Sequence, residues 1–142
     1  MGAIGIAIYY WPSKKIQYVG AIIKPLFIPR RFKSKDKIHF VDFIPGTFTL
    51  FKRDVLEKIG LWDYMCFPFH AEDADLCTRL WEKGYSVIVV PFIKAYHLKN
   101  VLIDVPREER AYYSGRSRII YYRKHLNKLA YIVYMATLNI FI

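Results

Sequence analysis

The stretch from Phe69 to His97 (FHAEDADLCTRLWEKGYSVIVVPFIKAYH) constrains the fold of this chain more than any other. Three carboxylates, Glu72, Asp73 and Asp75, open a segment with helical periodicity, and Gly84 ends it. Acidic residues suit the first turn of a helix, because they face its unpaired N–H groups and the positive end of its dipole. The pattern therefore predicts a helix that begins at the carboxylates.

The helical spacing separates the carboxylates between two faces. Asp75 can pair with Arg79 one turn later, which gives Asp75 a structural role. Asp73 heads an otherwise apolar stripe, and a carboxylate at the edge of a core suits general-base chemistry. The alternative is that all three are ordinary N-terminal helix charges. The predicted apolar face holds Asp73, Leu76, Cys77 and Leu80, and the opposite face holds Glu72, Asp75, Arg79 and Glu82.

The residues after this helix predict a buried strand. The segment from Tyr85 to Pro91 is rich in β-branched residues without polar alternation, which is typical of a strand covered on both faces. His97 is predicted just past the end of that strand, where open α/β sheets place their ligands. A lone histidine can equally be structural or solvated.

The preceding residues predict further elements of an α/β fold. Gly2 to Tyr10 and Ile16 to Ile23 are predicted strands, the second interrupted by Gly20. Strand character resumes from Phe40 to Phe51, with a break at Pro45-Gly46, and Lys52 to Ile59 is a predicted short helix.

Taken together, the segments VDFIPGTFTLFKRDVLEKIGLWD and FPFHAEDADLCTRLWEKGYSVIVVPFIKAYH resemble the acceptor-side half of a family 2 glycosyltransferase of GT-A fold. The resemblance rests on an ordered set of positions over about fifty residues rather than on one motif. These positions are Gly46, Leu50, Arg53, Ile59, Gly60, Trp62, Asp63, Glu72, Asp73, Asp75, Leu76, Arg79, Gly84, Tyr85, Pro91 and His97.

The resemblance implies an α/β fold, namely a partial GT-A mixed sheet with flanking helices and a C-terminal apolar helix. Residues 1–100 would form the acceptor-side half of the domain, and residues 101–142 a helical extension. The membrane association of this extension is expected from its own residue pattern, described below, and not from the resemblance. The implied activity is transfer of a sugar, with inversion, from a nucleotide-sugar donor to a lipid-linked or polysaccharide acceptor.

The same resemblance assigns roles to single residues. Asp73 would be the general base, and Glu72 its neighbour that positions the base or the acceptor. His97 would help to hold a divalent metal, Mn2+ or Mg2+, on the donor diphosphate. Arg116 suits contact with that diphosphate, although a surface arginine is an equal alternative. Trp62, Asp63 and Phe69 are predicted to bind the acceptor, since aromatic rings stack on sugar faces but also serve as core.

The family's donor half, a nucleotide-binding region that ends in Asp-x-Asp, does not appear in these residues. Asp73-Ala74-Asp75 has the same letters but lies in the predicted helix of the Glu-Asp motif. We therefore expect activity only from a completed enzyme, with a second chain as one source of the donor half. The divalent metal is likewise expected only there.

Composition points to an anionic partner surface. The chain has 22 Lys and Arg against 12 Asp and Glu, a formal net charge of +10, with 54% hydrophobic and 18% aromatic residues. Phospholipid headgroups, nucleotide phosphates or nucleic acid would complement this charge. Cys66 and Cys77 match neither a disulfide framework nor a zinc site and are predicted to be free thiols.

The C-terminal part predicts contact with a membrane. Glu108 to about Leu126 is a predicted helix rich in tyrosine and arginine, and Leu129 to Ile142 is nearly all apolar. This apolar run is shorter than the roughly twenty residues of a membrane span. It fits a helix in the membrane interface, the beginning of a span, or a core helix. We expect a cytoplasmic protein, peripheral at the inner face of the cell membrane.

Two other functions remain open at this point. The chain could be a non-catalytic basic and aromatic module that binds anionic lipid or nucleic acid, or an inactive truncated remnant. Nucleic acid is the less favoured partner, because no RNA-binding signature is present and the basic residues are spread over separate segments.

Overall fold

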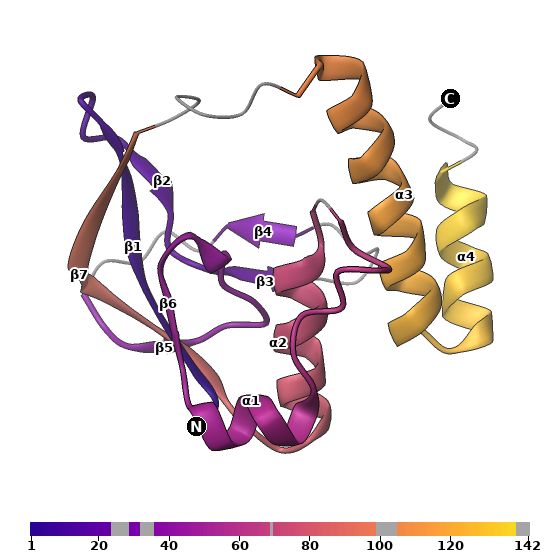
Figure 1. The fold of residues 1–142 in the computed structure, drawn as a ribbon, viewed down its shortest axis with the longest axis horizontal. Helices are drawn as coiled ribbons and strands as arrows, with labels where there is room; N and C mark the ends of the chain where they lie inside the picture. Colours follow the sequence, from indigo (N-terminus) through magenta and orange to yellow (C-terminus); the bar gives the residue numbers. More distant parts are fainter. Residues whose placement is uncertain (24–28, 32–35, 69, 99–104, 139–142) are drawn as a thin grey trace.

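The computed structural model describes residues 1–23, 29–31, 36–68, 70–98 and 105–138, with a curled mixed sheet beside a row of helices (Figure 1). At the centre of the sheet, β1 (Ala3–Trp11) runs parallel to β7 (Val87–Leu98). β2 (Ile16–Tyr18) and β6 (Thr49–Phe51) pair antiparallel with β1, and β5 (His39–Phe40) pairs antiparallel with β7. A second sheet joins β3 (Ala21–Ile23) to β4 (Pro29–Arg31).

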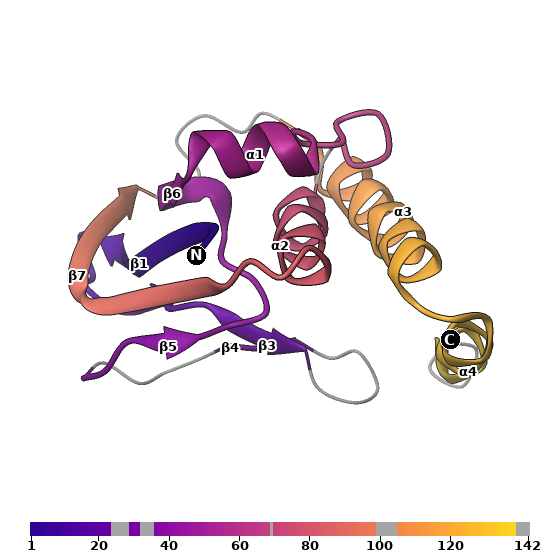
Figure 2. The same ribbon diagram turned by 90° about the horizontal axis from the view of Figure 1, so that it is seen from below.

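In the described part of the chain, four α-helices accompany these strands. α1 (Arg53–Ile59) follows β6 directly, and α2 (Glu72–Glu82) precedes β7. α3 (Arg107–His125) lies beside α2, and α4 (Lys128–Leu138) lies on the side of α3 away from the sheet (Figure 2). Within the described residues, no helix is long and apolar enough to cross a membrane.

Most predicted elements are confirmed. The helix that begins at the carboxylates ends before Gly84, which has φ of +78°. Gly20, with φ of +102°, separates β2 from β3 as predicted. Of the strand character predicted from Phe40 to Phe51, only Phe40 in β5 and Thr49–Phe51 in β6 are strand. The break at Pro45-Gly46 is a short 3-10 turn, η1 (Gly46–Phe48), directly before β6. Residues 139–142 of the predicted C-terminal helix lie outside the described part of the chain.

The predicted end of the last strand is wrong. β7 continues past Pro91 to Leu98, so His97 lies within the strand rather than beyond it. The register explains the difference: Ile6 of β1 pairs with Val90, whereas the next residue, Ala7, pairs with Lys94. Pro91 thus falls at an irregularity where a missing N–H is tolerated, and pairing resumes after it.

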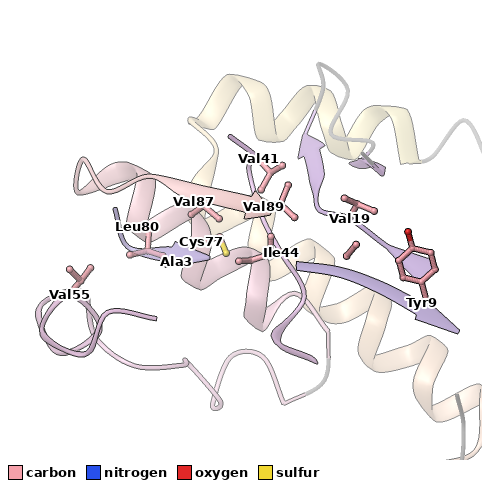
Figure 3. Packing of buried hydrophobic residues seen from close by; sticks show 11 residues of the cluster. Ala3, Tyr9, Val19, Val41, Ile44, Val55, Cys77, Leu80, Val87 and Val89 are labelled. Carbon is pink, nitrogen blue, oxygen red and sulfur yellow. The ribbon is translucent and has the colours of Figure 1, made fainter. Parts of the chain in front are cut away.

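One hydrophobic cluster packs α2 against the sheet (Figure 3). Cys77 and Leu80 of α2 meet Ala3 of β1 and Val87 and Val89 of β7, all of them buried. Burial of an aliphatic side chain of this size contributes roughly 1.5–3 kcal/mol. The predicted apolar face of α2 is therefore the face that holds it on the sheet.

A second cluster links the helices to one another. Tyr121 and Tyr122 of α3 and Tyr134 of α4 are buried with Phe67 and Ala74. The rings of Tyr122 and Tyr134 are 4.2 Å apart between centroids. This cluster holds α3 beside the start of α2, and α4 against α3.

Candidate functional site

The site is built around the first turn of α2. His70 and Ala71 precede the helix with φ of 64° and 66°, in the left-handed region that non-glycine residues rarely adopt. Such residues cost on the order of 1–3 kcal/mol each and cluster at functional sites. The two left-handed residues lead the chain abruptly into Glu72 and Asp73.

A cavity of about 250 Å³ opens beside this turn. Its walls come from β3, the start of α2 and one face of α3. The volume lies just below the range of about 300–1,000 Å³ that is typical of small-molecule sites. The polar lining residues are His70, Glu72, Asp73, Ser114 and Arg118, and the others are Ile23, Phe43, Ala71, Ala74, Tyr121 and Tyr122.

The Asp73 carboxylate is held in place by backbone. Its Oδ2 accepts a hydrogen bond of 2.7 Å from the N–H of Gly46. A Cβ on Gly46 would stand 2.6 Å from Oδ1 of Asp73, so only glycine fits at this distance. Burial raises the pKa of Asp73, and the hydrogen bonds from Gly46 and Trp62 and the charge of His70 offset only part of that rise. Asp73 is therefore a carboxylate with increased basicity at the edge of a cavity.

Glu72 lies next to it as a second perturbed carboxyl. Burial raises the pKa of Glu72, and the charge of Asp73 adds to this rise. A hydrogen bond from the backbone N–H of Glu72 itself lowers the pKa but does not cancel the rise. Its Oε2 is buried and has no hydrogen-bond partner among the described residues. The sequence predicted Glu72 on the opposite face from Asp73, but both line the cavity.

The histidine and arginine of the cavity were not predicted. Burial and the charge of Arg118 lower the pKa of His70, while Asp73 opposes that shift. Arg118 is three residues before Tyr121 and four after Ser114, so all three lie on one face of α3. This helical spacing is the feature of the sequence from which Arg118 could have been placed on the same face as Ser114 and Tyr121.

Asp75 has more partners than the predicted pair with Arg79. The predicted pair exists, with Arg79 Nε 2.9 Å from Oδ2 of Asp75. However, Asp75 is fully buried, and its Oδ1 also lies 2.9 Å from Lys124 Nζ and 2.7 Å from His125 Nε2. Burial alone would raise the pKa of Asp75, but these three partners lower it to about 2. We call Asp75 with Arg79, Lys124 and His125 the Asp75 cluster.

The Asp75 cluster joins three parts of the chain. Arg79 donates to the carbonyls of Ile59, Gly60 and Leu61 at 2.8–3.0 Å, which fixes the loop after α1. Lys124 and His125 belong to the last turn of α3. Through one buried carboxylate, α2 is thus tied to both α1 and α3.

The predicted acceptor residues occupy the loop between α1 and α2. The Trp62 indole contributes a hydrogen bond to Asp73 and stacks edge-on against Phe51 at 5.2 Å. Asp63 is engaged elsewhere, because its carboxylate binds Lys124 Nζ at 3.0 Å and the N–H of Cys66 at 3.1 Å. Phe69 lies outside the described residues. Their roles toward an acceptor stay predictions.

Arg116 lies near this loop rather than among the cavity residues. Its Nη1 donates to the carbonyl of Cys66 at 3.0 Å, which ties the loop to α3. Its predicted contact with a diphosphate stays a prediction. Cys66 and Cys77 are both free, as predicted, and burial raises the pKa of the Cys77 thiol to about 12.

His97 does not form a metal centre with other described residues. Its Nδ1 lies 3.0 Å from Oε1 of Gln17. Across the described ranges, no group of three or more His, Cys, Asp or Glu side chains is placed to hold a metal ion. The described residues therefore do not by themselves fit a divalent metal, and the role of His97 stays a prediction.

Comparison with solved structures supports the fold. GalNAc-T7, whose crystal structure contains UDP, GalNAc and Mn2+, matches with a TM-score of 0.52 at 14% identity. The match covers 68% of this chain and 22% of that protein, so this chain spans only a small part of its length. The shared architecture is the GT-A fold.

Comparison with protein families assigns the chain itself. No curated protein sequence matches it. The profile described as "Glycosyl transferase family group 2" matches residues 30–140, which include α2, α3 and every lining residue of the cavity except Ile23. The chain therefore belongs to glycosyl transferase family group 2.

Proposed function

We propose that this chain provides the acceptor side of an inverting glycosyltransferase, with Asp73 as the general base. The observation that carries the proposal is the geometry of Asp73, a half-buried carboxylate with a raised pKa at the edge of the cavity. A general base works best when its pKa approaches the operating pH, and burial shifts Asp73 in that direction.

The reaction exchanges one C–O bond for another. The acceptor hydroxyl oxygen attacks the anomeric carbon of a nucleotide-sugar from the side opposite the leaving group. The bond from that carbon to the diphosphate oxygen breaks, and the nucleoside diphosphate leaves with the bonding electrons. The hydroxyl proton moves to the Asp73 carboxylate, whose plane is fixed by the Gly46 N–H.

The cavity lining suits a sugar hydroxyl as the acceptor. Glu72, Ser114 and Arg118 offer hydrogen-bonding groups, and the rings of Tyr121 and Tyr122 offer apolar surface. A sugar presents both characters, with hydroxyls at its rim and C–H groups on its faces. In this proposal the acceptor is a glycan or a lipid-linked sugar, such as a cell-envelope polysaccharide precursor. Trp62, Asp63 and Phe69 would contact its outer part.

The donor side belongs to the completed enzyme. A nucleotide-sugar, and a divalent metal with His97 among its ligands, would bind with residues that a second chain or segment contributes. Arg116 would approach the donor diphosphate if it released the Cys66 carbonyl. No step of the reaction is assigned to the metal, because the described residues do not form its site.

The test is transfer by the completed enzyme carrying Asp73→Asn. Asparagine keeps the shape of the side chain but cannot accept the proton, so we expect a loss of roughly 10²–10⁴-fold in kcat. Asp54→Asn on α1, which alters an exposed carboxylate paired with Lys52, is the matched control. Near-normal turnover by Asp73→Asn in a protein with unchanged circular dichroism would refute the proposal. Product NMR would report whether the anomeric configuration inverts.

A further inference from the structure

One face of α4 presents apolar side chains that nothing in the described structure covers. Leu129, Ile132 and Val133 are 73%, 53% and 47% exposed, and Ala136 is also exposed. Their spacing of three, four and seven residues aligns them along one side of the helix. We call these four residues the α4 stripe.

The opposite side of α4 is occupied by protein. Tyr134 is buried against Tyr122 of α3, and Tyr131 and Met135 pack on the same cluster. Figures 1 and 2 both place α4 on the side of α3 away from the sheet. The face that carries the α4 stripe is therefore open to a partner.

The exposed charged residues nearest to the stripe in sequence are basic. Lys128 begins α4 and is exposed, as is Arg123 in the last turn of α3. α4 contains no acidic residue, and the chain as a whole carries a net charge of +10. A second copy of the chain would bring the same positive charge to the stripe, which disfavours self-association.

We propose that α4 lies in the interface of an anionic lipid bilayer, with the α4 stripe among the acyl chains and Arg123 and Lys128 at the headgroups. An amphipathic helix binds in this way when buried apolar area and attraction to anionic lipid act together. Each basic side chain close to such a surface strengthens binding roughly fivefold. This inference does not depend on the transferase activity.

The location would matter for the cavity. Tyr122 lines the cavity and is in ring contact with Tyr134 of α4. A docked α4 would thus hold the cavity near the bilayer, with α4 and part of α3 between them. A lipid-linked acceptor could then reach Asp73, a consequence that rests on the proposed function.

The experiment is sedimentation of the full chain with lipid vesicles. One set is phosphatidylcholine alone, and the other contains about one part in three phosphatidylglycerol. We expect binding to the anionic vesicles and roughly tenfold or greater weakening by Leu129→Glu, which places a charge in the acyl region. Arg123→Gln with Lys128→Gln should weaken binding to anionic vesicles roughly 20-fold, and more so at low salt.

The control separates the stripe from the change in net charge. Phe92 on β7 is 57% exposed, and Phe92→Glu alters the net charge as Leu129→Glu does. It should bind vesicles within about twofold of the unmodified chain, since α4 is intact. If Leu129→Glu changes the circular dichroism spectrum, Ala136→Glu replaces it, because that side chain is also exposed.

Two results would overturn the proposal. Equal vesicle binding by the unmodified chain, Leu129→Glu and Phe92→Glu would mean that only net charge attracts the protein to lipid. A dimer in analytical ultracentrifugation that Leu129→Glu converts to a monomer would mean that the stripe is an interface between copies.

Discussion

Gly46 is required at its position by a neighbouring side chain rather than by its own backbone angles. The Asp73 carboxylate occupies the space where a Cβ would stand, with Oδ1 at 2.6 Å. The same carboxylate receives the Gly46 N–H. Position 46 therefore controls the orientation of the proposed base, although it takes no part in proton transfer.

Gly46→Ala should consequently impair transfer while leaving the fold largely intact. The methyl group forces Asp73 to rotate away, and we expect kcat of the completed enzyme to fall by at least about tenfold. Gly115→Ala is the matched control, since a Cβ there meets nothing within 4 Å. In the exposed interior of α3, that change should raise stability by up to about 1 kcal/mol. Unchanged kcat in Gly46→Ala would show that the contact does not orient Asp73.

Glu72 should destabilise the fold at neutral pH. Its folded-state pKa is raised by burial, so the charged form is disfavoured in the folded chain. Below the ordinary glutamate pKa of about 4.5 the cost vanishes, and it grows as pH rises toward the folded-state pKa. Glu72→Gln is therefore expected to raise Tm at pH 7.5 and to leave Tm nearly unchanged at pH 4. A lower Tm at pH 7.5 would mean that Glu72 has a stabilising partner.

The Asp75 cluster controls how helices α1, α2 and α3 are held together. Asp75→Asn removes the charge that Arg79, Lys124 and His125 share. Lys124 keeps Asp63 and His125 keeps Glu82 as a partner, whereas Arg79 loses the carboxylate that it pairs with. We expect a loss of about 3–5 kcal/mol in the free energy of unfolding, measured by urea denaturation. The control is Glu57→Gln on α1, which breaks an exposed pair with Arg53 at the same helical spacing. That change should cost only a few tenths of a kcal/mol.

The same cluster should give stability a definite pH window. Asp75, with its pKa lowered to about 2, stabilises the fold above about pH 4 and loses this contribution as pH falls. Burial opposes the charge on His125, but hydrogen bonds to Asp75 and to Glu82 raise its pKa overall. Its contribution is therefore complete below about pH 6.5 and is lost as pH rises through the folded-state pKa.

Thermal unfolding from pH 3 to 9 tests this window. His125→Gln should remove the decline of Tm on the alkaline side while leaving the decline on the acidic side. His70 has the opposite effect on the pH dependence of Tm, because its lowered pKa means that its protonation disfavours the folded state as pH falls. A His125→Gln profile parallel to that of the unmodified chain would show that His125 is not charged in the folded state.

At the level of elements, the sequence pattern predicted the ends of helices and strands where interactions between neighbouring residues determine them. The start of α2 at its carboxylates and its end before Gly84 depend on capping and backbone angles within a few residues. The continuation of β7 past Pro91 depends on its pairing with β1, whose paired residues lie 87 positions earlier in sequence, as in Ala7 with Lys94. Likewise Lys124 and His125 reach Asp75 from about 50 residues away, and no local spacing indicates that contact.

At the level of the whole molecule, the candidate site combines segments that the sequence keeps apart. Asp73 was predicted from its place at the head of an apolar stripe, a property of α2 alone. The opposite wall comes from Ser114, Arg118, Tyr121 and Tyr122 of α3, whose position depends on the Asp75 cluster and on packing. The place of Asp73 at the edge of the core could therefore be predicted from sequence, but the cavity beside it could not.

The arrangement of the whole chain also leads to a prediction about binding of metal and nucleotide. His97 lies in β7 with Gln17 as its partner, and the described residues do not group around a metal. Calorimetric titration of this chain with UDP, GDP or dTDP, with and without Mn2+, should show no saturable micromolar binding. His97→Ala should change nothing in that experiment. Metal-dependent binding that His97→Ala abolishes would mean that the chain forms a donor site by itself, through association of copies.

Ala71 lowers the stability of the fold, because its backbone is left-handed with φ of 66°. Glycine would adopt this angle at little cost, but it would also loosen the turn that leads into Glu72 and Asp73. Under selection for heat resistance alone, position 71 would drift toward glycine. Under selection for a sharply placed carboxylate, it would keep a side chain. The residue found at position 71 across related chains would therefore record which of these two pressures has governed each lineage.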